Sequence, residues 1–339
     1  MHHSDFRWTR RQALWLFAGA IGTVGINACT RSTSDSSPVS AALGITTWIG
    51  NTALYIAKEK GFFEEAGLNL DVKTFSTVAE GFPAFTAGQL QAVTPVTSEA
   101  VSLAAKGIDY RIVAVLDTSV GADGILAQGN IQSIADFRGK QVAVQEGGVG
   151  HFFLLQILAE AGLSADDIEI VNTTPDAAAA AYEAGNIDIA YSYSPFMEKA
   201  NAAQPDGQII YDSSKMPTAI ADVVAFRTDF VEANPQAIEG FVSGLFKALD
   251  FLKTNEAEGL AIAAQPLNVT PEELADQLKG VQLPDLETNL AMLGNPQSDL
   301  YLLQPMTALA TFLTEQGQID TPPDLTSVLD PQFLKQLKG

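Results

Sequence analysis

The sequence predicts an α/β protein built of two lobes and followed by a largely helical region. Short β-like runs alternate with helical runs, and this alternation occurs twice along the chain. The chain has 339 residues, more than a single hydrophobic core usually serves, so two lobes are expected. From Pro235 onward, nearly every segment spaces its apolar residues as a helix does.

The first set of alternating elements is expected between residues 43 and 116. Residues 68–75 (LNLDVKTF) alternate apolar and polar side chains, as a strand with one buried face does. Residues 52–66 place apolar side chains at helical spacing with charges between them. The expected strands are 43–48, 68–75, 92–96 and 110–116, and the expected helices are 52–66, 81–88 and 98–106.

The second set is expected after Gly129, and the helical region follows it. The pattern again changes between short apolar runs and Ala-rich or Leu-rich helical runs. The expected strands are 141–145, 168–172 and 187–193, and the helices are 150–161, 176–184, 237–254, 256–264, 271–278 and 300–316. These sets predict two α/β lobes with mostly parallel sheets.

Residues 1–28 have the pattern of an export signal. Arg7, Arg10 and Arg11 form a basic segment, and residues 13–26 follow without any charge. That uncharged run is too short to span a bilayer as a permanent helix. The segment around Arg10 and Arg11 resembles a twin-arginine signal, and residues 26–29 (INAC) resemble a bacterial lipobox.

Cys29 is the only cysteine in the sequence, so disulfides are excluded as a means of stabilisation. It stands between the uncharged run and the Ser-rich residues 31–40. We expect Cys29 to carry a lipid, with residues 29–41 as a flexible tether. The protein is then expected on the periplasmic side of the bacterial cytoplasmic membrane, or at the cell surface where there is no outer membrane. The alternative is a buried free thiol within a helix.

Charge and motifs exclude several functional classes. The formal net charge is −21, which argues against nucleic acid as a partner because few positive charges would face the phosphates. The sequence has no His/Cys cluster with metal-ligand spacing, no GxxxxGK[ST] loop and no nucleophile elbow. We therefore expect no catalytic residue, no metal and no cofactor.

Several short motifs occur in the order known from one family. They are 48–51 (WIGN), 57–63 (AKEKGFF), 87–92 (AGQLQA), 137–140 (FRGK), 184–188 (AGNID), 194–196 (SPF) and 233–235 (ANP). Over residues 42–335 the chain resembles the substrate-binding proteins of nitrate/sulfonate/taurine-type ABC importers. Gln91 departs from the pattern, since the family usually has Asp there.

The resemblance implies the two-lobed clamshell of type II periplasmic binding proteins. Lobe I would comprise 42–124 plus 225–339, and lobe II would comprise 125–224. The ligand would bind between the lobes, which would close around it. The implied partners are a small-molecule ligand and ABC permease subunits, with the ATPase on a separate chain, and the protein is expected to be a monomer.

Candidate ligand-binding residues follow the expected strand ends. They are Trp48, Asn51, Glu80, Glu99, Asp117, Ser119, Asp123, Glu146, His151, Tyr191, Tyr193 and Asp222. The set contains several acids and no Arg or Lys, which favours a cation held by carboxylates and aromatic rings. The alternative is that these acids cap helices. For an anion, the Gly147–Gly150 loop would instead offer N–H groups at a helix start.

We expect the ligand to be a small nitrogen compound, with a cation such as guanidinium favoured. Alternative ligands are an aliphatic sulfonate, nitrate or a pyrimidine related to thiamine precursors. The fold also resembles thiamine-pyrimidine synthases, and His151 is the one histidine after the signal. However, Cys29 stands alone where those enzymes have a cysteine-rich motif, so we expect a binding protein and not an enzyme.

Overall fold

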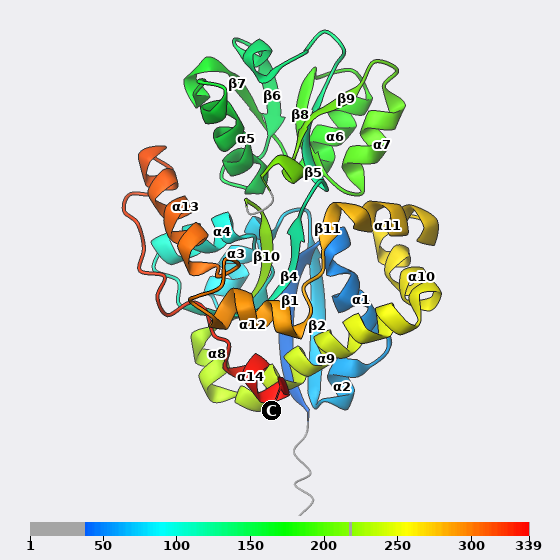
Figure 1. Ribbon diagram of the computed structural model, residues 1–339, viewed down its shortest axis with the longest axis vertical. Coiled ribbons are helices and arrows are strands. Elements are labelled where there is room, and N and C mark those ends of the chain that lie inside the picture. Colours follow the sequence, from blue (N-terminus) through cyan, green and yellow to red (C-terminus); the bar gives the residue numbers. More distant parts are fainter. Residues whose placement is uncertain (1–37, 217–218, 339) are drawn as a thin grey trace, which may run out of the picture. The chain divides into compact units, whose positions relative to one another are not determined.

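The computed structural model describes residues 38–216 and 219–338. Ser37–Gly339 form one compact unit. The predicted export signal, Cys29 and most of the predicted tether lie outside the described residues. Among the described residues, no helix combines the length and the apolar character needed to cross a membrane. Two sheets, each covered by helices, organise this unit (Figure 1).

The first sheet runs in the order β11-β4-β10-β3-β1-β2. Strand β1 pairs in parallel with β2 and β3, whereas β10 is antiparallel to both β3 and β4. The strands are β1 (Val39–Thr46), β2 (Leu68–Phe75), β3 (Ala92–Val93), β4 (Tyr110–Ser119), β10 (Ala221–Arg227) and β11 (Val281–Gln282). We call this sheet and the helices around it the first lobe.

The helices of the first lobe come from both ends of the described chain, and most of the later ones form the predicted helical region. The expected helix 52–66 is divided, because Gly61 adopts a left-handed conformation with φ 70° between α1 and α2. The helices are α1 (Thr52–Glu59), α2 (Phe62–Glu65), α3 (Val78–Thr86), α4 (Thr97–Ala105), α8 (Thr228–Ala233), α9 (Pro235–Thr254), α10 (Glu256–Leu267), α11 (Pro271–Gln277), α12 (Leu286–Gly294), α13 (Leu303–Glu315) and α14 (Gln332–Lys338).

The second sheet has the order β7-β6-β8-β5-β9, and with its helices it forms the second lobe, green in Figure 1. Strand β6 is parallel to β7 and β8, and β5 is antiparallel to β8 and β9. The elements are β5 (Asp123–Ala127), β6 (Gln141–Val144), α5 (Val149–Glu160), β7 (Glu169–Asn172), α6 (Pro175–Glu183), β8 (Ile189–Tyr193), α7 (Phe196–Ala203) and β9 (Gln208–Asp212). Short 3-10 helices in the two lobes are η1 (Ile49–Asn51), η2 (Ile134–Phe137), η3 (Ala165–Asp167), η4 (Ser213–Lys215) and η5 (Leu278–Gly280).

The chain passes between the lobes twice, from β4 to β5 and from β9 to β10. Ser213 joins these two crossings: its hydroxyl lies 2.7 Å from the Ser119 hydroxyl and accepts the Gly121 N–H at 2.7 Å. The boundaries expected at 124/125 and 224/225 fall inside β5 and β10 and not between elements.

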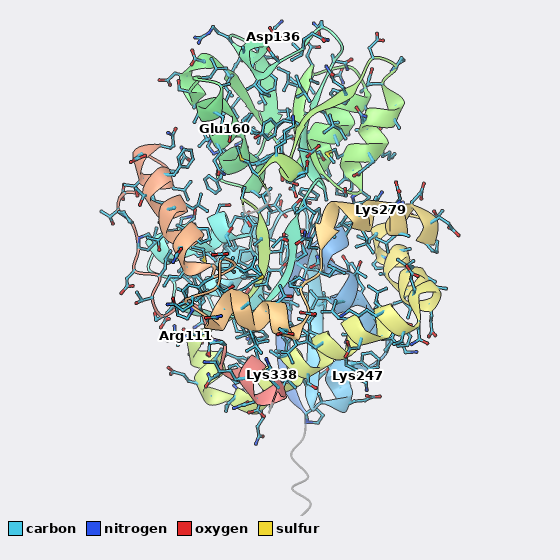
Figure 2. The ribbon with its side chains drawn as sticks, in the orientation of Figure 1. Arg111, Asp136, Glu160, Lys247, Lys279 and Lys338 are labelled. Atoms are coloured by element: carbon cyan, nitrogen blue, oxygen red, sulfur yellow. The ribbon has the colours of Figure 1, made fainter. Side chains whose placement is uncertain are left out.

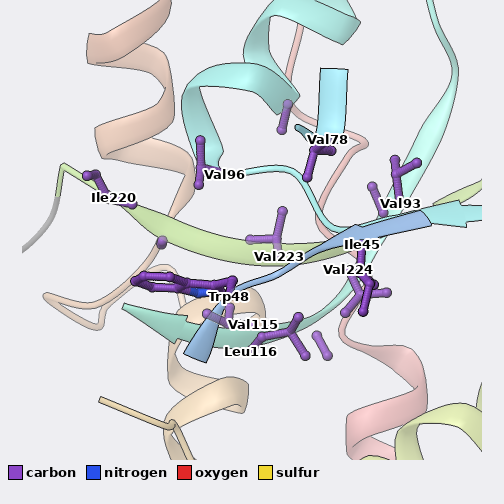
Figure 3. Close-up of a cluster of buried hydrophobic side chains, with 14 of the residues drawn as sticks. Ile45, Trp48, Val78, Val93, Val96, Val115, Leu116, Ile220, Val223 and Val224 are labelled. Atoms are coloured by element: carbon purple, nitrogen blue, oxygen red, sulfur yellow. The ribbon is translucent and has the colours of Figure 1, made fainter. Parts of the chain in front are cut away.

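The predicted α/β fold with two lobes and a helical C-terminal region is confirmed. The sheets are more mixed than predicted, because β5 and β10, the strands that follow the crossings, run antiparallel to their neighbours. The core spans both lobes and includes β4 and β10 residues that are almost fully buried. Figure 3 shows part of this apolar layer, with Val115, Val223 and Trp48 among the side chains drawn.

Candidate functional site: an acidic cavity between the lobes

A small cavity with a volume of about 40 Å³ lies between the two lobes. The first lobe and the returning crossing contribute Thr46, Trp48, Thr77, Val78, Thr94, Val96, Glu99, Ile220 and Asp222; the second lobe contributes Asp123, Gln145, Val149, Pro175 and Tyr193. Most of these residues stand at or just beyond the carboxyl ends of parallel strands, where open α/β sheets place ligands. Asp123 and Asp222 instead stand near the beginning of antiparallel strands, which brings them to the same edge.

Two contacts join the lobes across the cavity. The rings of Trp48 and Tyr193 meet edge to face, with centroids 5.6 Å apart and planes at 80°. The side-chain amide of Gln145 donates a hydrogen bond to the Thr77 hydroxyl at 3.1 Å. These contacts link wall residues of different lobes, so the structure represents a closed arrangement.

Buried carboxylates concentrate at the cavity. Glu99, Asp123 and Asp222 line it with 4%, 2% and 8% of their surfaces exposed, and Asp117 is fully buried behind Trp48. Asp117 and Asp222 are directly opposed on the paired strands β4 and β10. Like charges in such positions repel each other, and burial removes the water that would screen them.

This environment raises the pKa of each carboxyl group. Burial raises the pKa of Glu99 to about 7, opposed by the backbone N–H groups of Val96 and Val149. Burial raises the pKa of Asp117 to about 8 despite the hydrogen bond from Trp48, and it raises the pKa of Asp123 to about 6. The pKa of Asp222 lies well above its usual range, first through burial and then through the charges of the other acids. Ionising the whole cluster without a counter-charge is therefore unfavourable.

The hydrogen bonds within the cluster leave oxygen atoms free. One Asp123 oxygen accepts the Tyr191 hydroxyl, and one Asp117 oxygen accepts the Trp48 indole N–H at 3.0 Å. The second oxygen of each carboxyl group is buried without a hydrogen-bond partner among the described residues. A buried oxygen atom without a hydrogen bond destabilises the folded protein. Of these two residues, Asp123 lines the cavity. A donor in the cavity would satisfy the free Asp123 oxygen.

Positive side chains are placed elsewhere. In the part of the chain that the structure describes, no Lys, Arg or His lines the cavity. Lys247, Lys279 and Lys338, labelled in Figure 2, are exposed, and the first two pair with Glu65 and Asp276. No group of three or more His, Cys, Asp or Glu in residues 38–216 and 219–338 is arranged to hold a metal ion.

The structure brings five of the predicted site residues to the cavity wall: Trp48, Glu99, Asp123, Tyr193 and Asp222. Asp117 and Tyr191 stand behind that wall and bond to Trp48 and Asp123. Tyr191 fits there because residue 150 is glycine, since a Cβ atom would lie 2.1 Å from the Tyr191 ring.

The other predicted site residues are placed outside the cavity wall. Asn51 is buried and donates to the Thr46 carbonyl, and Ser119 bonds to Ser213 at the crossing. Glu80 and Glu146 are exposed, and Glu80 accepts the Ser76 N–H at the start of α3.

His151 is buried on α5 and also stands outside the wall. Its Nδ1 accepts the Gly147 N–H at 3.2 Å. Burial lowers the pKa of His151, opposed by the charge of Glu146. The Nδ1 atom of His151 is therefore already hydrogen-bonded to the loop that precedes α5.

The list of candidate residues left out several wall residues, chiefly hydroxyl, amide and small apolar groups. They are Thr46, Thr77, Val78, Thr94, Val96, Gln145, Val149, Pro175 and Ile220. Their position within a few residues of a strand end is the one signal that could have found them, but the same signal also selects the exposed Glu80 and Glu146.

Two sheets joined by two crossings, with a cavity between them, define a two-lobed solute-binding protein of the type II periplasmic class. The NMT1/THI5-like family model matches residues 48–258, more than half of the chain. The chain belongs to the NMT1/THI5-like family, and the predicted family resemblance is confirmed.

Individual proteins agree with this assignment. The taurine-binding periplasmic protein of Escherichia coli is 28% identical over 270 residues, covering 76% of this chain and 81% of that protein. Two solved structures share the fold. The aliphatic sulphonate-binding protein SsuA of Escherichia coli has a TM-score of 0.70 at 20% identity, covering 86% of this chain and 98% of its own. The nitrate-binding protein NrtA of Synechocystis PCC 6803 has a TM-score of 0.61 at 16% identity, covering 84% and 92%.

Proposed function

We propose that this protein is the extracytoplasmic solute receptor of an ABC importer and that it captures a small, planar, nitrogen-containing cation such as guanidinium. The proposed ligand class rests on the composition of the cavity wall. It combines three buried carboxyl groups and two aromatic rings with no basic side chain among the described residues. The free buried oxygen of Asp123 supplies an acceptor that a cationic N–H donor would satisfy.

A planar cation matches the chemical groups of the cavity wall. Its N–H groups are donors only, and Glu99, Asp123 and Asp222 offer acceptors around the cavity. The rings of Trp48 and Tyr193 offer aromatic surface, which attracts cations when water is excluded. A monocation also reduces the mutual repulsion of the acids, so binding and closure of the lobes would reinforce each other.

An anionic ligand fits this wall poorly. A sulfonate or nitrate would place negative oxygens beside Asp123, which has a pKa of about 6 and is largely ionised at neutral pH, and like charges so placed repel each other. The start of α5 offers N–H groups at the cavity, but the backbone N–H of Val149 already stabilises the charge of Glu99. The relatives named for taurine, sulphonate and nitrate therefore support the transport role more than the ligand.

A binding role fits the site better than an enzymatic one. His151, the histidine weighed as an acid-base group, stands outside the cavity wall and accepts a backbone hydrogen bond through Nδ1. The contacts between Trp48 and Tyr193 and between Gln145 and Thr77 instead serve closure of the lobes around a solute. The closed protein would deliver its ligand to permease subunits, held near the membrane by a lipid on Cys29.

Calorimetric titration of the compact unit Ser37–Gly339 tests the ligand class. The panel is guanidinium chloride, taurine, sodium nitrate and a thiamine-type pyrimidine, with sodium chloride at matched ionic strength as the blank. We expect guanidinium alone to bind at micromolar concentration or below. Binding of taurine or nitrate in preference to guanidinium would overturn the cation assignment and leave the transport role standing.

A further inference from the structure

We propose that Asp117 and Gly50 are positioning residues that determine the ligand class by fixing the indole of Trp48. In this arrangement the indole N–H is bound to a carboxylate behind the cavity wall. The ring's carbon surface is then what Trp48 presents to a ligand. This inference rests on the proposed capture of a cation, and it adds residues that stand outside the cavity wall.

The contact between Trp48 and Asp117 is buried and direct. The indole Nε1 lies 3.0 Å from Oδ2 of Asp117, and the two residues are 4% and 0% exposed. Trp48 lines the cavity, whereas Asp117 does not. Asp117 sits near the end of β4, a strand of the first sheet's core, so its carboxyl group is held by rigid backbone. The hydrogen bond therefore fixes the ring from the side away from the ligand.

Gly50 makes this contact possible. It lies in η1, the turn that directly follows Trp48. A Cβ atom at residue 50 would lie 1.8 Å from Oδ2 of Asp117 and 2.3 Å from Nε1 of Trp48. Both distances are far below van der Waals contact, so any larger residue would displace the carboxylate, the indole or the turn. The hydrogen-bonded atoms of Trp48 and Asp117 occupy the space that a side chain at residue 50 would fill.

The consequence for specificity follows from the chemistry of indole. A free indole N–H is a donor that would suit an oxygen of a sulfonate or nitrate. Here that donor is used by Asp117, and the remaining ring surface attracts positive charge. When a cation binds and Asp117 ionises, its carboxylate behind the ring adds negative potential on the same side. Asp117 thus favours a cation in two ways without touching it.

Trp48 is also a convenient reporter of this arrangement. The sequence has three tryptophans, at positions 8, 15 and 48, so Trp48 alone remains in the compact unit Ser37–Gly339. Its fluorescence then measures one indole and its contact with Asp117. In the ligand-free unit we expect the emission to change with pH around the Asp117 pKa of about 8, and Asp117→Asn should remove that step and leave only the changes caused by Glu99, Asp123 and Asp222 in the same cavity wall.

The binding test compares Asp117→Asn, which keeps an oxygen acceptor for the indole, with Asp117→Ala, which removes it. Guanidinium affinity measured by Trp48 fluorescence should fall about tenfold further in Asp117→Ala than in Asp117→Asn, because the alanine variant also loses the hydrogen bond. Gly50→Ala should weaken binding at least as much as Asp117→Ala. Gly81→Ala is the matched control, since its new Cβ would meet nothing nearer than 3.4 Å, and it should bind like the unchanged protein.

Equal affinities in Asp117→Asn and Asp117→Ala would overturn the positioning role, as would an emission step near pH 8 that keeps its full size in Asp117→Asn. Melting curves identify any variant that fails to fold. If Asp117→Ala does not fold, Asp117→Asn, which preserves the shape of the side chain, still tests the role of Asp117 through its emission profile. If the unchanged protein does not bind guanidinium, the proposed ligand fails, while the ligand-free emission profile still decides whether Asp117 holds Trp48.

Discussion

The acids at the cavity and the acids at the surface have opposite electrostatic environments. Asp136, labelled in Figure 2, has its pKa lowered by backbone N–H groups at the start of η2, and Asp285 is held in the same way at the start of α12. Asp117 and Asp123 have theirs raised, because burial outweighs the hydrogen bonds that they accept. The comparison teaches that an acid after a strand or before a helix is a cap when water reaches it and a candidate ligand group when water does not.

The strongest expected effect separates one buried acid from one exposed acid. Asp123→Asn removes a carboxylate that lines the cavity, and guanidinium affinity should fall on the order of 100-fold. Glu146→Gln removes an exposed carboxylate outside the cavity wall, and affinity should stay within about twofold. Titration calorimetry of both variants gives the answer, and similar losses in the two would erase the distinction between the two kinds of acid.

The free energy of unfolding should fall as the pH rises, because folding raises the pKa values of the buried acids. Their pKa values are raised on folding, so between the unfolded value near 4 and the folded value of about 8 for Asp117 the native state binds more protons. Stability is then highest at acid pH and is lost as pH rises through this window. We expect the ligand-free unit to lose about 4 kcal/mol or more of unfolding free energy between pH 5 and pH 8, since Asp117 alone contributes about 1.4 kcal/mol per pH unit below its folded pKa.

Urea unfolding at several pH values measures this slope. Asp117→Asn should reduce this slope, because asparagine cannot ionise while Glu99, Asp123 and Asp222 still can, and saturating guanidinium should oppose it by stabilising the ionised cluster. A slope of the opposite sign would mean that the cluster is already compensated without a ligand.

A surface cap should show the opposite dependence on pH. The Asp285 carboxylate accepts the Thr288 N–H at 2.9 Å at the start of α12, so Asp285→Ala should cost about 1 kcal/mol of unfolding free energy at neutral pH. Because the pKa of Asp285 is lowered on folding, this contribution is present above the unfolded pKa and fades as the pH falls through the folded one. Denaturation of Asp285→Ala beside Asp285→Asn checks it, and guanidinium binding should be unchanged in both.

The smallest expected effect concerns the contact between the lobes. Gln145→Ala removes the donor to Thr77, which joins the lobes only when they are closed, and should weaken guanidinium binding about threefold, mainly through faster release. Stopped-flow fluorescence of Trp48 measures the release rate. An unchanged rate in Gln145→Ala, and in Thr77→Val as its partner variant, would mean that this contact does not hold the closed state.

Much of the fold could be predicted from local sequence patterns. The expected helix 237–254 and the strand 110–116 match α9 and β4 closely, because both have long, regular apolar spacing. Two strands of the second lobe were not predicted. Strand β5 follows the first crossing, and strand β9 forms an edge of the second sheet. Strand β10 spans the lobe boundary expected at 224/225, and its antiparallel direction depends on where the chain re-enters the first sheet. Local periodicity carries no information on that direction.

By itself, the sequence determined the α/β class, the helical C-terminal region, the family and an acidic set of candidate residues. Tertiary structure alone decided which acids gather at the cavity, since Asp222 in its wall and Asp117 behind it are 105 positions apart in the sequence yet are paired across β4 and β10. It also decided that Glu146 meets water while Asp123 does not. The physical reason is that a residue's position after a strand is local, whereas burial depends on what the other lobe covers.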